Sequence, residues 1–208
     1  VPATPKKHTK SLDNGLSNGT FSVNRLGTIN TWSASLPADG MWYATDEARA
    51  YGSIISVEGN SFARISSPQY SSGGFTQLIE AHPGQIISFT GESRGFDSQQ
   101  NIYFYLIPRN QEGEILQAFS FNLVNPGINW TEGTVSGTMP EGTNSCQVLF
   151  FKGSTGIVDF DNAEIQITET GQDRDGDGVL DLEDSYPDDQ KLAFDDYYPA
   201  KDKPGTLA

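Results

Sequence analysis

Five aspartates and a glycine near the C-terminus are spaced like the ligands of a calcium-binding loop. Over residues 173–184 the aspartates take loop positions 1, 3, 5, 9 and 12, and Gly178 takes position 6. Ca²⁺ requires about six to eight oxygen ligands, and this spacing directs carboxylates inward around a sharp bend that glycine permits. The backbone carbonyl at position 7 adds another oxygen. The predicted ligands of a bound Ca²⁺ are Asp173, Asp175, Asp177, Val179, Asp181 and Asp184.

A solvated acidic linker is the alternative interpretation of the same residues, although five clustered carboxylates would repel one another without a cation. The loop departs from an EF-hand because Asp184 stands where a bidentate glutamate is usual. Its flanks do not predict two helices, since Ile165–Ile167 alternates like a strand and Pro187 ends any helix early. The pattern instead resembles thrombospondin type 3 repeats over residues 173–196, which implies a calcium-ordered spacer outside cells.

The charge of the chain argues against two classes of partner. The net charge is −14, and residues 169–208 contribute −8 through twelve acids and four bases. No group of Lys and Arg is dense enough to follow a phosphate backbone, so nucleic acid and anionic membrane surfaces are not expected as partners. No apolar run is long enough to span a bilayer, so direct membrane insertion is not expected either.

Catalysis is not expected from the nucleophiles and bases of the sequence. The single cysteine, Cys146, alternates with apolar residues and is predicted to be a buried hydrophobe. The two histidines, His8 and His82, lie in a basic tail and in a turn, which does not suit a Ser-His-Asp arrangement. Glycoside hydrolysis by a pair of carboxylates stays open, because their distance in space decides that chemistry.

Short β-like runs fill residues 15–168, and glycine-containing turns such as His82–Gly84 and Pro140–Gly142 separate them. The runs are residues 20–26, 52–57, 61–66, 75–80, 85–91, 101–108, 115–122, 131–137, 145–152 and 157–168. Their even spacing, with no helical periods between them, predicts an all-β antiparallel sandwich or barrel. The expected core side chains are Phe89, Phe104, Phe119, Phe121, Leu149 and Phe151, together with Trp32 and Trp130.

Aromatic and turn motifs follow one another in a characteristic order through this region. They are, in sequence order, Gly15–Phe21, Trp32, Gly74–Ile79, His82–Phe89, Trp130, Met139–Gly142 and Gly156–Ile165. This order resembles the jelly-roll carbohydrate-binding modules of the family 4, 9, 16 and 22 type over residues 12–168. The resemblance implies an antiparallel jelly-roll β-sandwich that binds a polysaccharide or another glycan.

That group of modules often carries a structural Ca²⁺ between its opening and closing segments. Carried over to this sequence, the resemblance implies a second calcium site with ligands from Asp161, Asn18 and Thr20. Ser22 and Asn162 stand where the group has carboxylates, and neutral groups weaken a site for a hard cation.

Aromatic side chains in loops or on a sheet face are the candidate sugar-binding residues, because flat rings stack on a pyranose while polar groups bond to its hydroxyls. Trp42 and Tyr43 lead this set, since they lie in a turn-rich loop where functional side chains concentrate. Tyr103 and Tyr105 alternate along one strand and should share the face opposite Phe104. Further candidates are Tyr51, Tyr70, Arg49, Gln77, Arg94 and Asn101. Packing of these rings in the core or at its rim is the competing interpretation.

The C-terminal residues Asp184–Pro199 and Gly205–Ala208 are similar to the lead-in of the LruC-type domain, which occurs in exported, often lipid-anchored, bacterial surface proteins. The sequence thus predicts a linker over 1–12, a sandwich over 13–168, a calcium-binding repeat over 169–196 and a tail over 197–208. We expect a non-catalytic glycan-binding module, extracellular or on the outer surface of a bacterium, with a lipid anchor on its N-terminal side. A structural or adhesive module that binds a surface protein is the alternative.

Overall fold

The computed structural model describes residues 6–12, 20–21, 27–28, 41–45, 48–96 and 101–173. The elements found in these residues are β1 (Lys6–Leu12), β2 (Gly27–Thr28), β3 (Tyr43–Ala44), α1 (Ala48–Tyr51), β4 (Gly52–Val57), β5 (Asn60–Glu80), β6 (Ile86–Gly95), β7 (Asn101–Arg109), β8 (Phe119–Val124), β9 (Thr131–Thr138) and β10 (Ser145–Asp173). The predicted all-β fold with antiparallel pairing is confirmed. Two details differ from it, because α1 is one helical turn and β2 pairs with β3 in parallel.

The chain divides into two compact units. Ser11–Thr168 forms the first, and it contains the sandwich. The second consists of Val1–Lys10 and Glu169–Ala208, and among its described residues β1 pairs with β10.

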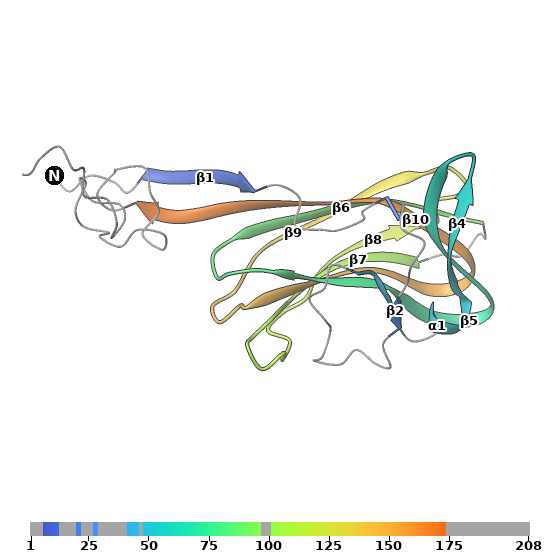
Figure 1. The fold of residues 1–208 in the computed structure, drawn as a ribbon, viewed down its shortest axis with the longest axis horizontal. Helices are drawn as coiled ribbons and strands as arrows, with labels where there is room; N and C mark the ends of the chain where they lie inside the picture. The colour runs from blue at the N-terminus through green and yellow to red at the C-terminus, as the bar shows by residue number, and fades with distance from the viewer. Residues whose placement is uncertain are drawn as a thin grey trace, which may run out of the picture. The chain divides into compact units, whose positions relative to one another are not determined.

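The sandwich has two layers that share their two longest strands, β5 and β10 (Figure 1). The first layer has the strand order β8-β7-β10-β5-β3-β2. The second layer has the order β4-β5-β10-β6-β9. Hydrogen bonding is therefore continuous from one layer to the other through the paired strands β5 and β10.

Strand β10 passes from the first layer to the second near Gly156. Ser145–Lys152 pairs with β7, whereas Val158–Thr168 pairs with β6. Between these two stretches the register with β5 shifts, and Gly156 has a φ of 86°. Glycine adopts this left-handed conformation without steric strain, which suits it to the bend.

The core between the layers is centred on Phe150, which is wholly buried. Its ring centroid lies 4.9 Å from that of Phe89, 5.0 Å from Phe160 and 5.1 Å from Phe104. Trp42 stacks on the same ring at 5.7 Å. Each fully buried ring stabilises the fold by about 1.5–3 kcal/mol relative to an exposed one, so this cluster is the main apolar contribution to the sandwich.

Two glycines on neighbouring strands leave space for these rings. A Cβ on Gly91 would lie 2.4 Å from Cζ of Phe150, and a Cβ on Gly133 would lie 2.6 Å from Cε2 of Phe104. Gly91 and Gly133 are paired across β6 and β9. The second layer thus approaches the aromatic cluster closely because these positions have no side chain.

The predicted core is partly confirmed. Phe89 and Phe104 are wholly buried in it, and Phe119 and Phe121 pack against it from β8. Leu149 is also wholly buried, but it lies on the outer face of the first layer, opposite Tyr105. Phe151 was expected in the core, but it is only half-buried and lies on the outer face of the first layer. The reason is strand alternation: Phe150 is opposite Phe104, so its neighbour Phe151 must point the other way.

The tryptophans also differ from expectation. Trp42, expected as an exposed platform, is 1% exposed and stacks in the core. Trp130, expected in the core, is half-buried and packs edge-on against Phe62, with 5.7 Å between ring centroids. Trp32 lies outside the described residues.

Candidate functional site

Three aromatic side chains form a cluster on the outer face of the first layer. Tyr103 and Tyr105 stack with 5.7 Å between ring centroids and an interplanar angle of 22°. Phe151 meets both rings, at 6.3 Å from Tyr103 and 6.1 Å from Tyr105. All three are half-buried, so they present ring surface and two phenolic hydroxyls on one face of the sheet. We call them the tyrosine cluster.

The register of β7 and β10 explains why these side chains meet. Tyr103 is opposite Phe151, and Tyr105 is opposite Leu149. The intervening Phe104 is opposite Phe150 and faces the core. The predicted common face for the two tyrosines is therefore confirmed. Partial burial raises the pKa of Tyr105, with a smaller contribution from Tyr103, so its hydroxyl stays protonated and keeps its hydrogen-bond donor.

A buried polar pair lies on the same face of the first layer. The Arg109 guanidinium donates to Oε1 of Gln147 from Nη2 at 2.6 Å and from Nε at 3.2 Å. Arg109 also donates from Nη1 to the carbonyl oxygen of Gly113 at 2.6 Å. Burial lowers the pKa of Arg109, because desolvation disfavours its charged form. These bonds fix which end of the Gln147 amide faces Arg109.

The other end of that amide, Nε2 of Gln147, is a buried donor with no hydrogen-bond partner among the described residues. An unpaired buried amide group costs about 1–3 kcal/mol. Such groups are uncommon in folded proteins.

Two predicted ligand residues lie on this face as well. Tyr43 is opposite Thr76 in β5 and is 8% exposed, so little of its ring is accessible to a ligand. Asn101 begins β7 and is half-buried opposite Val124.

The remaining predicted ligand residues lie elsewhere. Trp42 and Gln77 are buried, at 1% exposure each. Tyr51 is 38% exposed on α1. Arg94 belongs to the outer face of the second layer, where it pairs with Asp159. Two more candidates, Tyr70 in β5 and Arg49 in α1, have side chains outside the described ones.

The sequence missed three residues of this face: Phe151, Arg109 and Gln147. Alternation within β10 and β7 was the available signal, because each of the three shares its parity with Leu149 or Tyr105. Choosing the parity required knowing that Phe150 faces the core.

Most of the predicted calcium ligands lie outside the described residues. Asp175, Asp177, Val179, Asp181, Asp184 and Asn18 lie outside the described residues. Asp173 is the last residue of β10, and its side chain is not among those described. Within the described part of the chain, no group of three or more His, Cys, Asp or Glu side chains is placed to hold a metal ion.

Asp161, predicted as a ligand of the second calcium site, is 1% exposed and has both carboxylate oxygens engaged. Oδ2 accepts from Nδ2 of Asn60 at 3.1 Å, and Oδ1 accepts from the backbone N–H of Asn162 at 2.8 Å. Burial raises its pKa, and these hydrogen bonds oppose that rise. Thr20 is exposed. The second calcium site stays a prediction.

Comparison with solved structures identifies the fold. A family 61 carbohydrate-binding module, solved in complex with beta-1,4-galactotriose, has a TM-score of 0.52 and 12% sequence identity, over 73% of this chain and 97% of that chain. A family 4 carbohydrate-binding module has a TM-score of 0.50 and 19% identity, over 73% of this chain and 99% of that chain. The enzymatically active domain of bacteriophage CBA120 tailspike protein 4 has a TM-score of 0.54 and 14% identity, over 74% of this chain but 21% of that chain.

At these identities the similarity establishes the fold, which is the jelly-roll β-sandwich found in carbohydrate-binding modules. No protein-family model matches the sequence, and no curated protein matches it. Among the described residues there is no helix of the length and apolar character needed to cross a membrane.

Proposed function

We propose that this chain is a non-catalytic glycan-binding module that works outside the cell or on the bacterial surface. The observation that carries the proposal is the tyrosine cluster, which places two stacked phenols and Phe151 on one sheet face. Ring surface beside hydroxyl donors matches a sugar, which has an apolar C–H face and a rim of hydroxyl groups. The jelly-roll fold shared with carbohydrate-binding modules supports the same class of ligand.

Binding in this proposal proceeds without chemistry on the sugar. A pyranose ring stacks on Tyr103 and Tyr105, and their hydroxyls bond to its hydroxyl groups. The Arg109–Gln147 pair stiffens the strands beneath, since it links β7 to β10 at 2.6 Å. A rigid platform loses little conformational entropy when the ligand binds, which favours affinity.

A double variant, Tyr103→Ala with Tyr105→Ala, tests the proposal. Calorimetric titration against a panel of neutral oligosaccharides, with beta-1,4-galactotriose included, should show the parent protein binding at least one of them. The double variant should lose at least about tenfold in affinity, equivalent to about 1.4 kcal/mol. Val57→Ala is the matched control, because Val57 is 52% exposed on β4 in the other layer.

Two results would contradict the proposal. One is a parent protein that binds no glycan of the panel but does bind a cell-surface protein. The other is a double variant with unchanged affinity and an unchanged melting temperature. A reducing-sugar assay with each bound oligosaccharide should detect no cleavage, and cleavage would overturn the non-catalytic assignment.

The proposal includes a calcium-ordered connector after the sandwich. It is supported by the spacing of aspartates between Asp173 and Asp184 around Gly178, which suits Ca²⁺ coordination. Calcium is abundant outside cells, so the same residues favour an extracellular or surface location. A lipid anchor on the N-terminal side would hold such a module at the cell surface.

A further inference from the structure

The outer face of the second layer carries a second cluster, made of two arginines, a buried aspartate and three aromatic rings. Arg64 lies on β5, Arg94 on β6 and Asp159 on β10 between them. Asp159 is directly opposite both arginines in the register of the three strands. The rings are Phe62, Phe96 and Trp130. We call this set the arginine pair and its rings.

Both guanidinium groups are held by the same carboxylate. Arg64 donates from Nε to Oδ1 of Asp159 at 2.6 Å and from Nη2 to Oδ2 at 2.9 Å. Arg94 donates from Nε to Oδ2 at 2.8 Å. The Asp159 side chain is wholly buried, whereas those of Arg64 and Arg94 are 26% and 23% exposed. The hydrogen bond to Asp159 raises the pKa of Arg64, which keeps the guanidinium charged.

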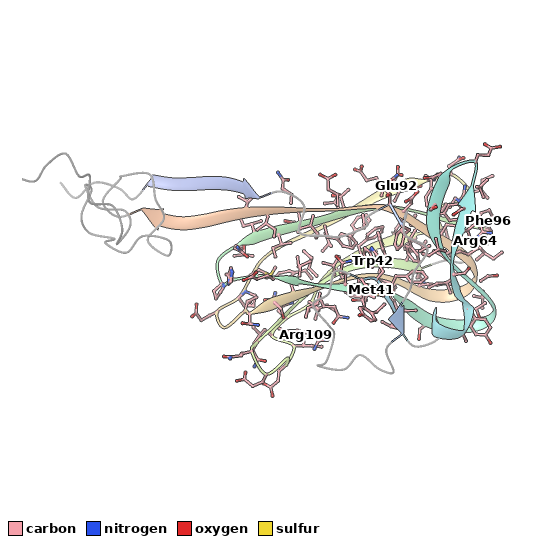
Figure 2. All side chains as sticks on the ribbon, viewed as in Figure 1. Met41, Trp42, Arg64, Glu92, Phe96 and Arg109 are labelled. Carbon is pink, nitrogen blue, oxygen red and sulfur yellow. The ribbon has the colours of Figure 1, made fainter. Side chains whose placement is uncertain are left out.

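The aromatic rings hold the guanidinium planes in place. The guanidinium carbon of Arg94 lies 4.4 Å from the ring centroid of Trp130 and 5.4 Å from that of Phe96. The guanidinium carbon of Arg64 is also 5.4 Å from Phe96, and Figure 2 shows these two side chains side by side. Phe96 is 43% exposed, so it offers ring surface next to both cations.

The charges of this cluster do not balance. One cation suffices to neutralise Asp159, yet two are present. Among the described residues, Asp159 is the only carboxylate within ion-pair distance of either guanidinium. Within this set the two guanidinium groups exceed the one carboxylate by one charge, while Glu92 and Asp161 form the next outward-facing pair and Asp161 interacts electrostatically with Arg94. The terminal nitrogens of Arg94 make no hydrogen bond in the described part of the structure, so they have donors available.

We infer that the arginine pair binds the carboxylate of a uronic acid unit in an acidic glycan. A planar guanidinium presents paired N–H donors that match the two oxygens of a carboxylate, and it is less strongly hydrated than an ammonium group. The exposed ring of Phe96 gives the pyranose of that unit an apolar surface to lie against. The inference takes from the proposed function only that the ligand is a glycan, and it places a second site on the outer face of the second layer.

Neighbouring acids restrict how the uronate enters. Glu92 is opposite Asp161, one outward-facing pair further along β6 and β10. Nδ2 of Asn162 donates to Glu92 at 2.5 Å, and Asn60 donates to Asp161 at 3.1 Å, so both carboxylates are fixed. An anion would be repelled from that side. The uronate therefore approaches from the side of Phe96.

The test compares one oligosaccharide with and without its charge. Oligogalacturonate and its fully methyl-esterified form have the same ring and linkage, but only the first has free carboxylates. Calorimetric titration should show the parent protein binding the acid at least about tenfold more tightly than the ester. Added sodium chloride should weaken binding of the acid and leave binding of the ester unchanged.

The critical variant is Arg94→Gln, because Arg64 still donates two hydrogen bonds to Asp159 after Arg94 is removed. It should reduce the preference for the acid by about tenfold, and its melting temperature shows whether the fold is retained. Phe96→Ala should weaken binding of the acid, while Asp159 keeps its hydrogen bonds to Arg64 and Arg94. Arg94→Lys should restore less than half of the lost binding free energy, since an ammonium group lacks the planar pair of donors.

Equal affinity for acid and ester in the parent protein would overturn the inference. So would an Arg94→Gln variant that folds and keeps the full preference. A preference for dextran sulfate over oligogalacturonate would overturn the assignment to a carboxylate. The double variant Tyr103→Ala with Tyr105→Ala separates the two sites, because failure of the tyrosine cluster would leave the response to Arg94→Gln intact.

Discussion

Phe150 and Phe151 are adjacent in the sequence and point to opposite faces of β10. Phe150 is wholly buried, and among the described residues four aromatic rings lie within 6 Å of its own, at 4.9, 5.0, 5.1 and 5.7 Å. Phe151 is half-buried against Tyr103 and Tyr105 on the outer face. One residue therefore belongs to the core and the next to the proposed ligand platform.

This pair predicts that two chemically identical changes affect different properties, stability in one case and ligand binding in the other. Phe150→Ala removes the central ring of the core and should lower the free energy of unfolding by about 3–5 kcal/mol. Phe151→Ala should cost less than about 1.5 kcal/mol, because the ring is half-exposed, but it should weaken glycan binding. Urea unfolding and calorimetric titration on both variants measure the two effects. Equal destabilisation by the two changes would contradict the assignment of faces.

The same pair shows what the sequence predicted and what it did not. Alternating apolar runs between turns predicted the strands, the antiparallel sandwich and the shared face of Tyr103 and Tyr105. Alternation alone does not show which of two neighbouring aromatic residues faces the core. That is why the sequence predicts Phe151 for the core and predicts both Trp42 and Tyr43 for the surface. The parity follows from pairing with Phe104 and Thr76, which lie far away in sequence.

The second layer was less predictable for a related reason. Arg64, Arg94 and Asp159 are ordinary charged residues in the sequence, and Asp159 is 95 residues from Arg64 and 65 from Arg94. They meet because β10 continues into the second layer and runs between β5 and β6. The sequence indicated two separate strands over 145–152 and 157–168, so this continuity and the contacts that depend on it were not foreseen.

The glycines under the core rings give a second stability prediction. Gly133→Ala would place a Cβ 2.6 Å from Cε2 of Phe104 and 2.9 Å from Cε1 of Phe121. Overpacking of this kind should destabilise the fold by about 1–3 kcal/mol. Gly153→Ala is the matched control, because the nearest atom to its Cβ would be 3.4 Å away, at Cε2 of Tyr103. Thermal unfolding of both variants measures the difference, and a stable Gly133→Ala protein would show that the rings move aside easily.

The buried thiol gives a prediction about pH. Burial raises the pKa of Cys146 from 9.0 to about 12, so the folded protein keeps the thiol proton where the unfolded chain loses it. The contribution of this proton to stability is present below pH 9.0 and is lost as the pH rises from there towards about 12. The free energy of unfolding should therefore fall with rising pH in that window more steeply than in a Cys146→Ala variant.

Alkylation provides a direct measurement of the same property. Iodoacetamide reacts with the thiolate, so the native protein should be modified at Cys146 much more slowly than the protein unfolded in urea. Mass spectrometry over time follows the modification. Rapid labelling of the native protein near neutral pH would contradict both the burial and the raised pKa of this thiol.

The calcium-binding loop predicts that metal removal changes one part of the chain selectively. Binding in the range of about 10⁻⁴ to 10⁻³ M is expected for an extracellular module of this kind. Residues 173–196 contain few apolar groups, so metal binding should supply most of the free energy that orders them. EDTA should therefore expose this segment to proteases while the sandwich, with its own aromatic core, remains intact.

Trypsin offers a sharp readout, because Arg174 lies between the first two predicted ligands, Asp173 and Asp175. Cleavage after Arg174 should be slow with calcium and fast with EDTA, as followed by mass spectrometry. Asp177→Asn should make cleavage fast even with calcium, whereas Asp202→Asn, an acid beyond the predicted repeat, should behave like the parent chain. If calcium leaves the cleavage rate unchanged, the aspartates form a solvated linker and the connector has no metal, although the tyrosine cluster would still bind its sugar.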